Sequence, residues 1–200
     1  MQEQVTTEDI KMGKITYCDN IMQSKEKYTE YITNHIKNVQ DAYKEASDAF
    51  KEIFPKVYEK DHLITELNMN LIQHDNSKFS DDEFWGYVMR FFPMKNIDPK
   101  SKQVKKDFDL AWLHHIHNNQ HHPQHWSFVD DGEIKVVDMP DIYIIEMLCD
   151  WMAMSKYHGS TTLEYWNSER AKKLPMSKYT KSKVEEFMKW MQKNNVHTLW

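Results

Sequence analysis

Apolar side chains between Ser24 and Phe54 recur at steps of three and four residues, and this pattern restricts the fold more than any other in the sequence. Such spacing lines one face of a helix, so the segment predicts a long amphipathic helix with one buried side. Pro55 predicts the end of this helix, because a proline disfavours the helical conformation in the residue before it. The apolar face comprises Tyr28, Tyr31, Ile32, Ile36, Val39, Ala42, Tyr43, Ala46, Ala49, Phe50 and Ile53.

The same spacing, together with capping signals, predicts helices along the rest of the chain. The expected helices run from about Lys60 to Gln73, from a capping box at Ser80–Glu83 to about Phe92, from near Ser101 through His115, from a cap at Asp138 through Ile142–Met154, from about Thr162 to Lys172, and from a second capping box at Ser182–Glu185. Residues 126–137 break the pattern, because two short apolar runs flank Asp130-Asp131-Gly132 and predict a β-hairpin.

Length and composition bound the fold class. A chain of 200 residues suits one domain, and four glycines with six prolines leave few tight turns for an all-β fold. We therefore predict a mainly α, single-domain helical bundle over residues 1–200 with one small hairpin. Its core is expected at roughly residues 24–158, with the C-terminal helices of residues 160–200 packed on it.

Charge and cysteine content restrict the partners and the compartment. The net charge is −5, and Arg90 and Arg170 are the only arginines among 26 basic residues, which argues against nucleic acid as a partner. Cys18 and Cys149 are too few for a disulfide framework. No secretory leader and no long apolar run is evident, so we expect no membrane association and a cytoplasmic protein, in the host cytoplasm if its source is viral.

Histidine is concentrated in two places. His74 precedes Asp75, and six histidines stand in the run His114, His115, His117, His121, His122 and His125, out of 11 in the chain. Imidazole and carboxylate are the ligands that zinc, manganese and iron accept. Two further candidates lie on apolar faces, His35 in the first helix and Asp150 in the segment Ile145–Met152. A buried carboxylate is costly without a partner, and a divalent cation is a strong one.

The order His35, His74-Asp75, His114-His115 and Asp150 resembles the HD-domain superfamily of metal-dependent phosphohydrolases, over roughly residues 28–155. The resemblance extends to Lys78 in His-Asp-x-x-Lys, where it implies a lysine that reaches toward a phosphate. The histidine run is distantly similar to the HD-GYP branch but lacks Gly-Tyr-Pro. The combination of HDxSKF, a double histidine, HHPxxW and a later Glu-x-x-x-Asp-Trp looks like a family of uncharacterised bacterial and phage proteins.

The histidines that would bind metal depend on where the fourth helix ends. If that helix continued, His115 and His122 would share the face of Phe108, Ala111 and Trp112, and we favour them. His114 and His121 share another face and stay open as alternatives. The expected metal ligands, for one or two divalent ions (Zn, Mn or Fe), are thus His35, His74, Asp75, His115, His121, His122 and Asp150. Simpler interpretations exist for two of these residues. His35 could be a histidine of the hydrophobic core, and His74 could cap the end of a helix.

The expected function is hydrolysis of a small phosphorylated substrate, with a nucleotide as the first class to consider. In this interpretation Lys78 offsets charge on the phosphoryl oxygens, and Glu146 or His114 orients water or protonates the leaving group. Two alternatives come from other classes. One is a di-iron oxygenase of the same superfamily, and the other is a metal-stabilised binding or inhibitor protein of viral origin without enzymatic activity.

Overall fold

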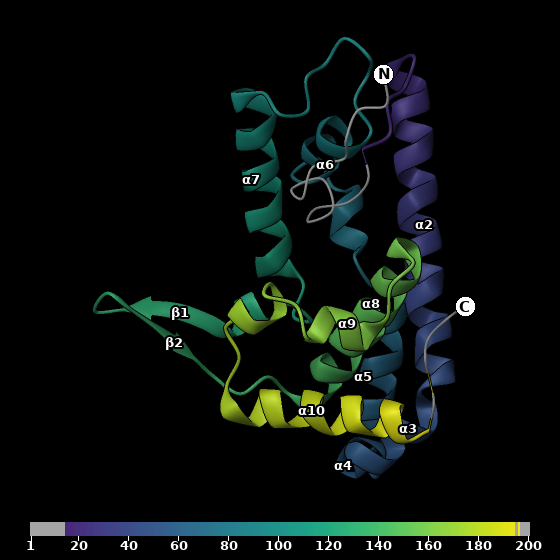
Figure 1. The fold of residues 1–200 in the computed structure, drawn as a ribbon, viewed down its shortest axis with the longest axis vertical. Helices are drawn as coiled ribbons and strands as arrows, with labels where there is room; N and C mark the ends of the chain where they lie inside the picture. The colour runs from purple at the N-terminus through teal and green to yellow at the C-terminus, as the bar shows by residue number, and fades with distance from the viewer. Residues whose placement is uncertain (1–14, 195, 197–200) are drawn as a thin grey trace. The chain divides into compact units, whose positions relative to one another are not determined.

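The computed structural model describes residues 15–194 and 196, and in these ranges the chain is mainly helical with one antiparallel hairpin, as predicted (Figure 1). The elements are α2 (Ile21–Glu45), α3 (Ser47–Ile53), α4 (Pro55–Tyr58), α5 (Asp61–Ile72), η1 (Asn76–Phe79), α6 (Phe84–Phe91), α7 (Lys102–Asn118), η2 (Pro123–Trp126), β1 (Ser127–Asp130), β2 (Glu133–Val136), α8 (Asp141–His158), α9 (Thr162–Trp166), η3 (Ala171–Lys173) and α10 (Lys178–Lys193). None of the helices in these ranges combines the length and the apolar character needed to cross a membrane.

The chain divides into two compact units, and each is described by itself. The first unit comprises residues 15–34 and 75–115, and the second comprises residues 35–74, 116–194 and 196. Both α2 and α7 contribute residues to both units. The expectation of a single domain over residues 1–200 stays a prediction.

The first unit has an aromatic core. Tyr28 of α2 stacks on Tyr87 of α6 at 6.2 Å between ring centroids, and Tyr87 meets Phe108 of α7 edge to face at 5.3 Å. Gly86 permits this close approach of α6 to α7, since a Cβ there would lie 2.6 Å from the Cβ of Ala111. The start of α6 is thereby held against α7, the helix that carries His114 and His115.

The second unit is built around α8, whose side chains from Ile142 to Ala153 are almost all buried. In this unit α8 contacts α5, α9 and α10, and α10 also contacts α3. Phe50 of α3 and Phe187 of α10 stack at 5.2 Å. Cys149 is fully buried in this core, as expected of a small apolar residue.

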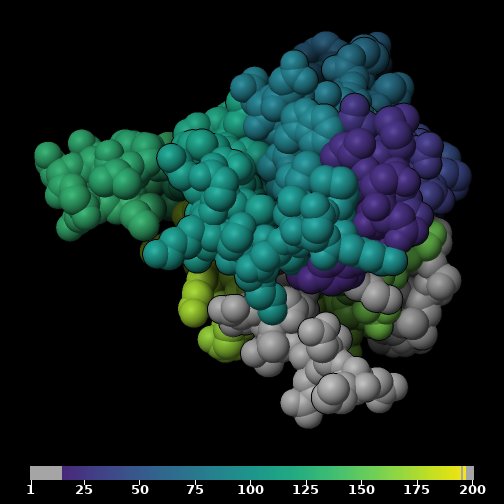
Figure 2. Space-filling model, turned by 90° about the horizontal axis from the view of Figure 1, so that it is seen from above, coloured from purple at the N-terminus to yellow at the C-terminus, as the bar shows by residue number. Residues whose placement is uncertain are grey.

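The hairpin of the second unit forms where Asp131-Gly132 predicts it. Ser127 pairs with Val136 and Asp130 with Glu133, and both turn residues have positive φ, 50° at Asp131 and 81° at Gly132. Those angles are typical of a two-residue turn of this kind. Nearly every hairpin side chain is exposed, and Figure 2 shows the atoms of the hairpin in green.

Three predicted helix starts are wrong. The hydroxyl of Ser80 donates to the carbonyl of Ser77 at 2.6 Å, and α6 starts after Glu83 without a capping side chain in the described structure. Pro140, not Asp138, precedes α8. Helix α10 starts at Lys178, because Ser177 accepts from the backbone N–H of Thr180 at 3.1 Å, whereas Ser182 lies inside the helix and bonds to the carbonyl of Tyr179.

Candidate metal site

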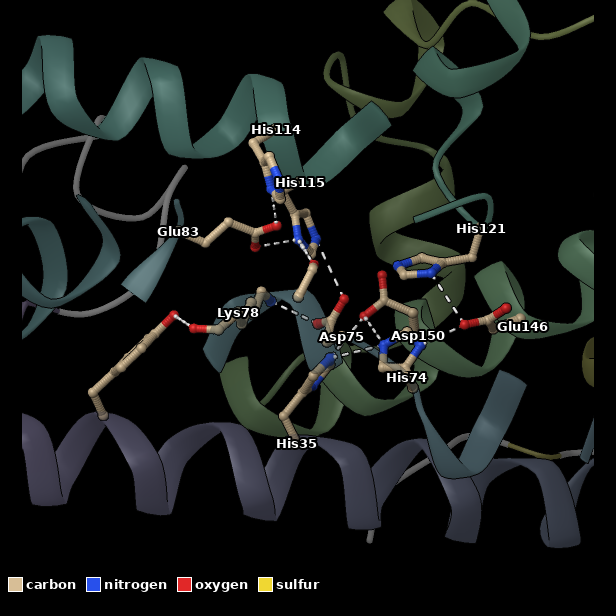
Figure 3. A network of polar contacts seen from close by, with 12 residues as sticks. His35, His74, Asp75, Lys78, Glu83, His114, His115, His121, Glu146 and Asp150 are labelled. Carbon is tan, nitrogen blue, oxygen red and sulfur yellow. Dashed lines mark hydrogen bonds and ion pairs between the residues drawn. The ribbon is translucent and has the colours of Figure 1, made fainter. Parts of the chain in front are cut away.

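Three elements of the second unit bring two imidazoles and a carboxylate to one point. His35 comes from α2, His74 from the turn after α5, and Asp150 from α8. His35 Nε2 lies 3.1 Å from Asp150 Oδ1 and 3.3 Å from His74 Nε2, and His74 Nε2 lies 3.8 Å from Asp150 Oδ1. Both histidines are buried, and Figure 3 shows the three side chains directed toward one another.

These separations fit one metal ion. A circle through three atoms so spaced has a radius of about 2.0 Å, within the range of about 2.0–2.2 Å found from zinc to imidazole nitrogen and carboxylate oxygen. An ion could therefore contact all three atoms without movement of the backbone.

Glu146 fixes the orientation of the His74 ring. Its Oε1 lies 2.8 Å from His74 Nδ1, so Nδ1–H donates to the carboxylate and the Nε2 lone pair of the neutral ring faces His35 and Asp150. Histidines that bind metals commonly donate their second N–H to a carboxylate in this way. His121 also contacts Glu146, with 3.1 Å between His121 Nδ1 and the same oxygen.

The electrostatics of this cluster favour ionised carboxylates. Burial alone would raise the pKa of the Glu146 carboxyl, but contacts with His121 and His74 outweigh it and lower the pKa to about 2. Burial acts in the same direction on Asp150, but its contacts with His35 and His74 outweigh burial and bring its pKa well below the usual range. The second unit therefore presents two carboxylates among imidazoles, which is a suitable environment for a cation.

The first unit holds a second polar cluster, centred on Glu83. This fully buried carboxylate lies 2.8 Å from His114 Nδ1 through Oε1 and 2.8 Å from His115 Nδ1 through Oε2. His115 Nε2 in turn lies 3.3 Å from Asp75 Oδ1, and Lys78 donates to Asp75 Oδ2 at 2.6 Å. His115 thus lies between the carboxylates of Glu83 and Asp75. In the second unit, His74 lies in the same way between those of Glu146 and Asp150.

Burial determines the charge of His115. It lowers the pKa of the imidazole more than the nearby carboxylates of Asp75 and Glu83 raise it, so His115 is neutral near pH 7. The pKa of Glu83 is lowered despite burial, because His115, Ser77 and His114 donate to its carboxylate. Asp75 adopts the left-handed conformation with φ 57°, which aspartate tolerates better than most residues.

The structure assembles most of the predicted site residues in two groups. The second unit brings together His35, His74, His121, Glu146 and Asp150, and the first brings together Asp75, Lys78, His114 and His115. His122 is half-buried, with its ring 4.2 Å from that of His121. Helix α7 ends at Asn118, so the shared helical face that favoured His122 does not extend to it.

Sequence reasoning missed the role of Glu83, because it assigned this residue to a capping box. A signal was present in the spacing. Glu83 directly precedes α6 and stands four residues before Tyr87, which predicts that it points to the same side as this inward-facing tyrosine, and both are buried. A carboxylate at such a position needs buried donors, and the double histidine supplies them.

A comparison with protein-family models places the chain in a family. The model of DUF5662, a family of unknown function, matches residues 24–190. The chain belongs to this family. The match to DUF5662 includes every candidate site residue from His35 to Asp150. No curated protein and no solved structure matches the chain.

Proposed function

We propose that this protein is a metal-dependent phosphohydrolase that acts on a small phosphorylated molecule. The observation that carries the proposal is the convergence of His35 Nε2, His74 Nε2 and Asp150 Oδ1 at separations of 3.1, 3.3 and 3.8 Å. The order of the motifs along the chain, which resembles that of the HD-domain superfamily, supports the same reaction class. A nucleotide is the first substrate class to test.

The residues of the second unit have distinct roles in this proposal. His35, His74 and Asp150 hold the ion, and Glu146 keeps the lone pair of His74 Nε2 directed at it. A bound divalent ion supplies a lowered pKa for water and a positive charge beside the phosphoryl oxygens. Asp150 has a lowered pKa and is therefore ionised at neutral pH, as a ligand must be.

The first unit, taken by itself, holds a cation and two imidazoles. The ammonium of Lys78 is mostly buried, bonds to Asp75 at 2.6 Å and lies 5.4 Å from the centroid of the Tyr87 ring. This environment limits its motion, so Lys78 offers a localised positive charge for a phosphoryl group. His114, about one-third exposed, is the candidate for exchange of protons with water during the reaction.

Metal analysis and an activity assay test the proposal together. Untagged protein is analysed by mass spectrometry for bound metal and then incubated with Mn²⁺ and a panel of phosphorylated compounds while phosphate release is followed. We expect stoichiometric metal and metal-dependent release, both abolished in Asp150→Asn. Asp48→Asn is the matched control, because Asp48 is 85% exposed in the same unit.

Two results would contradict the proposal. One is an Asp150→Asn protein that retains full metal content, and the other is the absence of metal-dependent phosphate release from every compound of the panel. Folded state is monitored by circular dichroism in each variant, so loss of metal is separated from loss of structure.

A second candidate function is oxygen-dependent oxidation at an iron centre. Two histidines and one carboxylate form the ligand set typical of non-haem iron oxygenases, and His35, His74 and Asp150 are such a set. Bound iron with an absorption spectrum that changes on exposure to oxygen would favour this candidate. Zinc or manganese without oxygen uptake would favour the hydrolase.

A further inference from the structure

A small cavity in the second unit adjoins the candidate metal site. It has a volume of about 300 Å³ and lies between the end of α5, the segment after α7 and the first turns of α8. Asn70 and Gln73 form one wall, and Tyr143 and Glu146 form another. A volume at the lower end of the range for ligand sites suits a single ring system and excludes a polymer.

Carboxamides dominate this cavity. Five of its eight lining side chains are Asn70, Gln73, Asn118, Asn119 and Gln120. Each carboxamide can donate and accept hydrogen bonds without carrying charge. Among the described residues that line the cavity none is a lysine or arginine, and the single carboxylate is that of Glu146. The lining therefore disfavours a phosphate and favours an uncharged group with several donors and acceptors.

The walls are held in place by contacts outside the cavity. The indole N–H of Trp126 donates to the carbonyl of Gln120 at 2.7 Å, and its ring lies 5.7 Å from that of Tyr143. Tyr143 donates to Glu66 at 3.1 Å; burial and this bond raise the pKa of its hydroxyl to about 12, so the phenol stays neutral. These contacts restrain Tyr143 and the backbone of Gln120, which reduces the entropy lost in this part of the wall when a ligand binds.

Glu146 connects the cavity to the metal site. Its carboxylate forms part of the cavity wall and accepts from His74 Nδ1 at 2.8 Å, while the opposite nitrogen of that ring faces His35 and Asp150. The Glu146 carboxylate and the His74 ring therefore connect the cavity to the point where the three ligand atoms converge.

We propose that this carboxamide-lined cavity binds the nucleobase of the phosphorylated substrate. Asparagine and glutamine pair with the edges of bases through two hydrogen bonds, and a neutral tyrosine ring offers a face for stacking. Asn70 and Gln73 are the specificity-determining residues, because Asn70 lies in the last turn of α5, Gln73 directly follows that helix, and both line the same wall. The assignment rests on the proposed function only for the phosphoryl end of the ligand.

Nucleosides test the cavity separately from catalysis, because they carry no phosphoryl group. Binding of adenosine, guanosine, cytidine and uridine to metal-free full-length protein is measured by calorimetry and by saturation-transfer NMR, with ribose and inorganic phosphate as further arms. We expect one nucleoside to bind and neither ribose nor phosphate to displace it. Asn70→Leu and Gln73→Met, which keep side-chain size, should each weaken binding about tenfold.

Asn68→Leu is the matched control, since Asn68 is exposed on the same helix and does not line the cavity. Absence of nucleoside binding, displacement by ribose alone, or equal binding by Asn70→Leu, Gln73→Met and the wild type would overturn the assignment. Nucleoside binding without metal-dependent phosphate release from any compound of the panel would leave the cavity assigned and refute the hydrolase. If neither cavity variant altered the rate or the substrate preference of hydrolysis, the hydrolase would stand and the cavity assignment would be refuted.

Discussion

Glu83→Gln tests whether one buried carboxylate orients two histidines. Glu83 is fully buried and accepts from His114 Nδ1 and His115 Nδ1 at 2.8 Å each. Glutamine has the same shape but one acceptor oxygen, and its second polar group is a donor. One of the two rings must then present a bare Nδ1 to the amide, so its proton moves to Nε2.

The cost of this change follows from the bonds lost. A hydrogen bond to a charged group contributes about 1.5–3 kcal/mol, and one of the two such bonds is replaced while the other loses its charge. Removal of a buried charge offsets part of this loss. We expect the free energy of unfolding to fall by about 2–4 kcal/mol, which for a chain of this size lowers Tm by roughly 5–15 °C.

Two measurements check the reasoning. Urea denaturation gives the free energy of unfolding, and nitrogen-15 NMR of metal-free protein reports which ring nitrogen carries the proton. In the wild type both rings should carry it on Nδ1, and in Glu83→Gln one ring should carry it on Nε2. Asp82→Asn is the control, because its carboxylate is 74% exposed and lies 3.5 Å from His114 Nε2, so it should cost less than about 1 kcal/mol.

The orienting role of Glu83 would be refuted if both rings of the glutamine variant kept the proton on Nδ1. It would equally be refuted if stability fell by less than about 0.5 kcal/mol, the scatter of ordinary surface substitutions. A loss of stability with unchanged tautomers would show that Glu83 contributes to packing and does not direct the imidazoles.

Three further predictions follow from the same geometry. Gly86→Ala should lower the free energy of unfolding by about 1–3 kcal/mol in thermal or urea denaturation, because its Cβ would lie 2.6 Å from that of Ala111; unchanged stability would contradict the close approach of α6 and α7. Glu146→Gln should weaken metal affinity about 10–100-fold in competition with a chelator, since it loosens the orientation of His74; wild-type affinity would exclude this role. The free energy of unfolding of the metal-free protein should fall as the pH drops below about 6.5, because buried His115 has a lowered pKa and the unfolded chain therefore binds protons more readily than the folded one. Urea midpoints that stay constant from roughly pH 7.5 to 5.5 would contradict this prediction.

Hydrophobic periodicity accounts for how much of the fold could be predicted. The helices over Lys60–Gln73 and Ser101–His115 correspond to α5 and α7, and Asp131-Gly132 marks the turn of the hairpin. These features depend on side chains near one another in sequence. Helix starts were less predictable, because a serine such as Ser80 or Ser182 can bond to a preceding carbonyl as readily as it caps a helix.

The sequence by itself determined the chemistry available to this protein. The residue types at His35, His74-Asp75, His115 and Asp150 and their places on apolar faces are local properties, and they suffice to predict an inward-facing set of metal-type ligands. The tertiary structure decided which atoms meet. Contacts between distant segments decide three features: that His74 faces Asp150, that Glu83 joins two histidines and does not cap a helix, and that carboxamides line one cavity. The reason is that a buried polar group takes whichever partner the packing of the helices brings within reach.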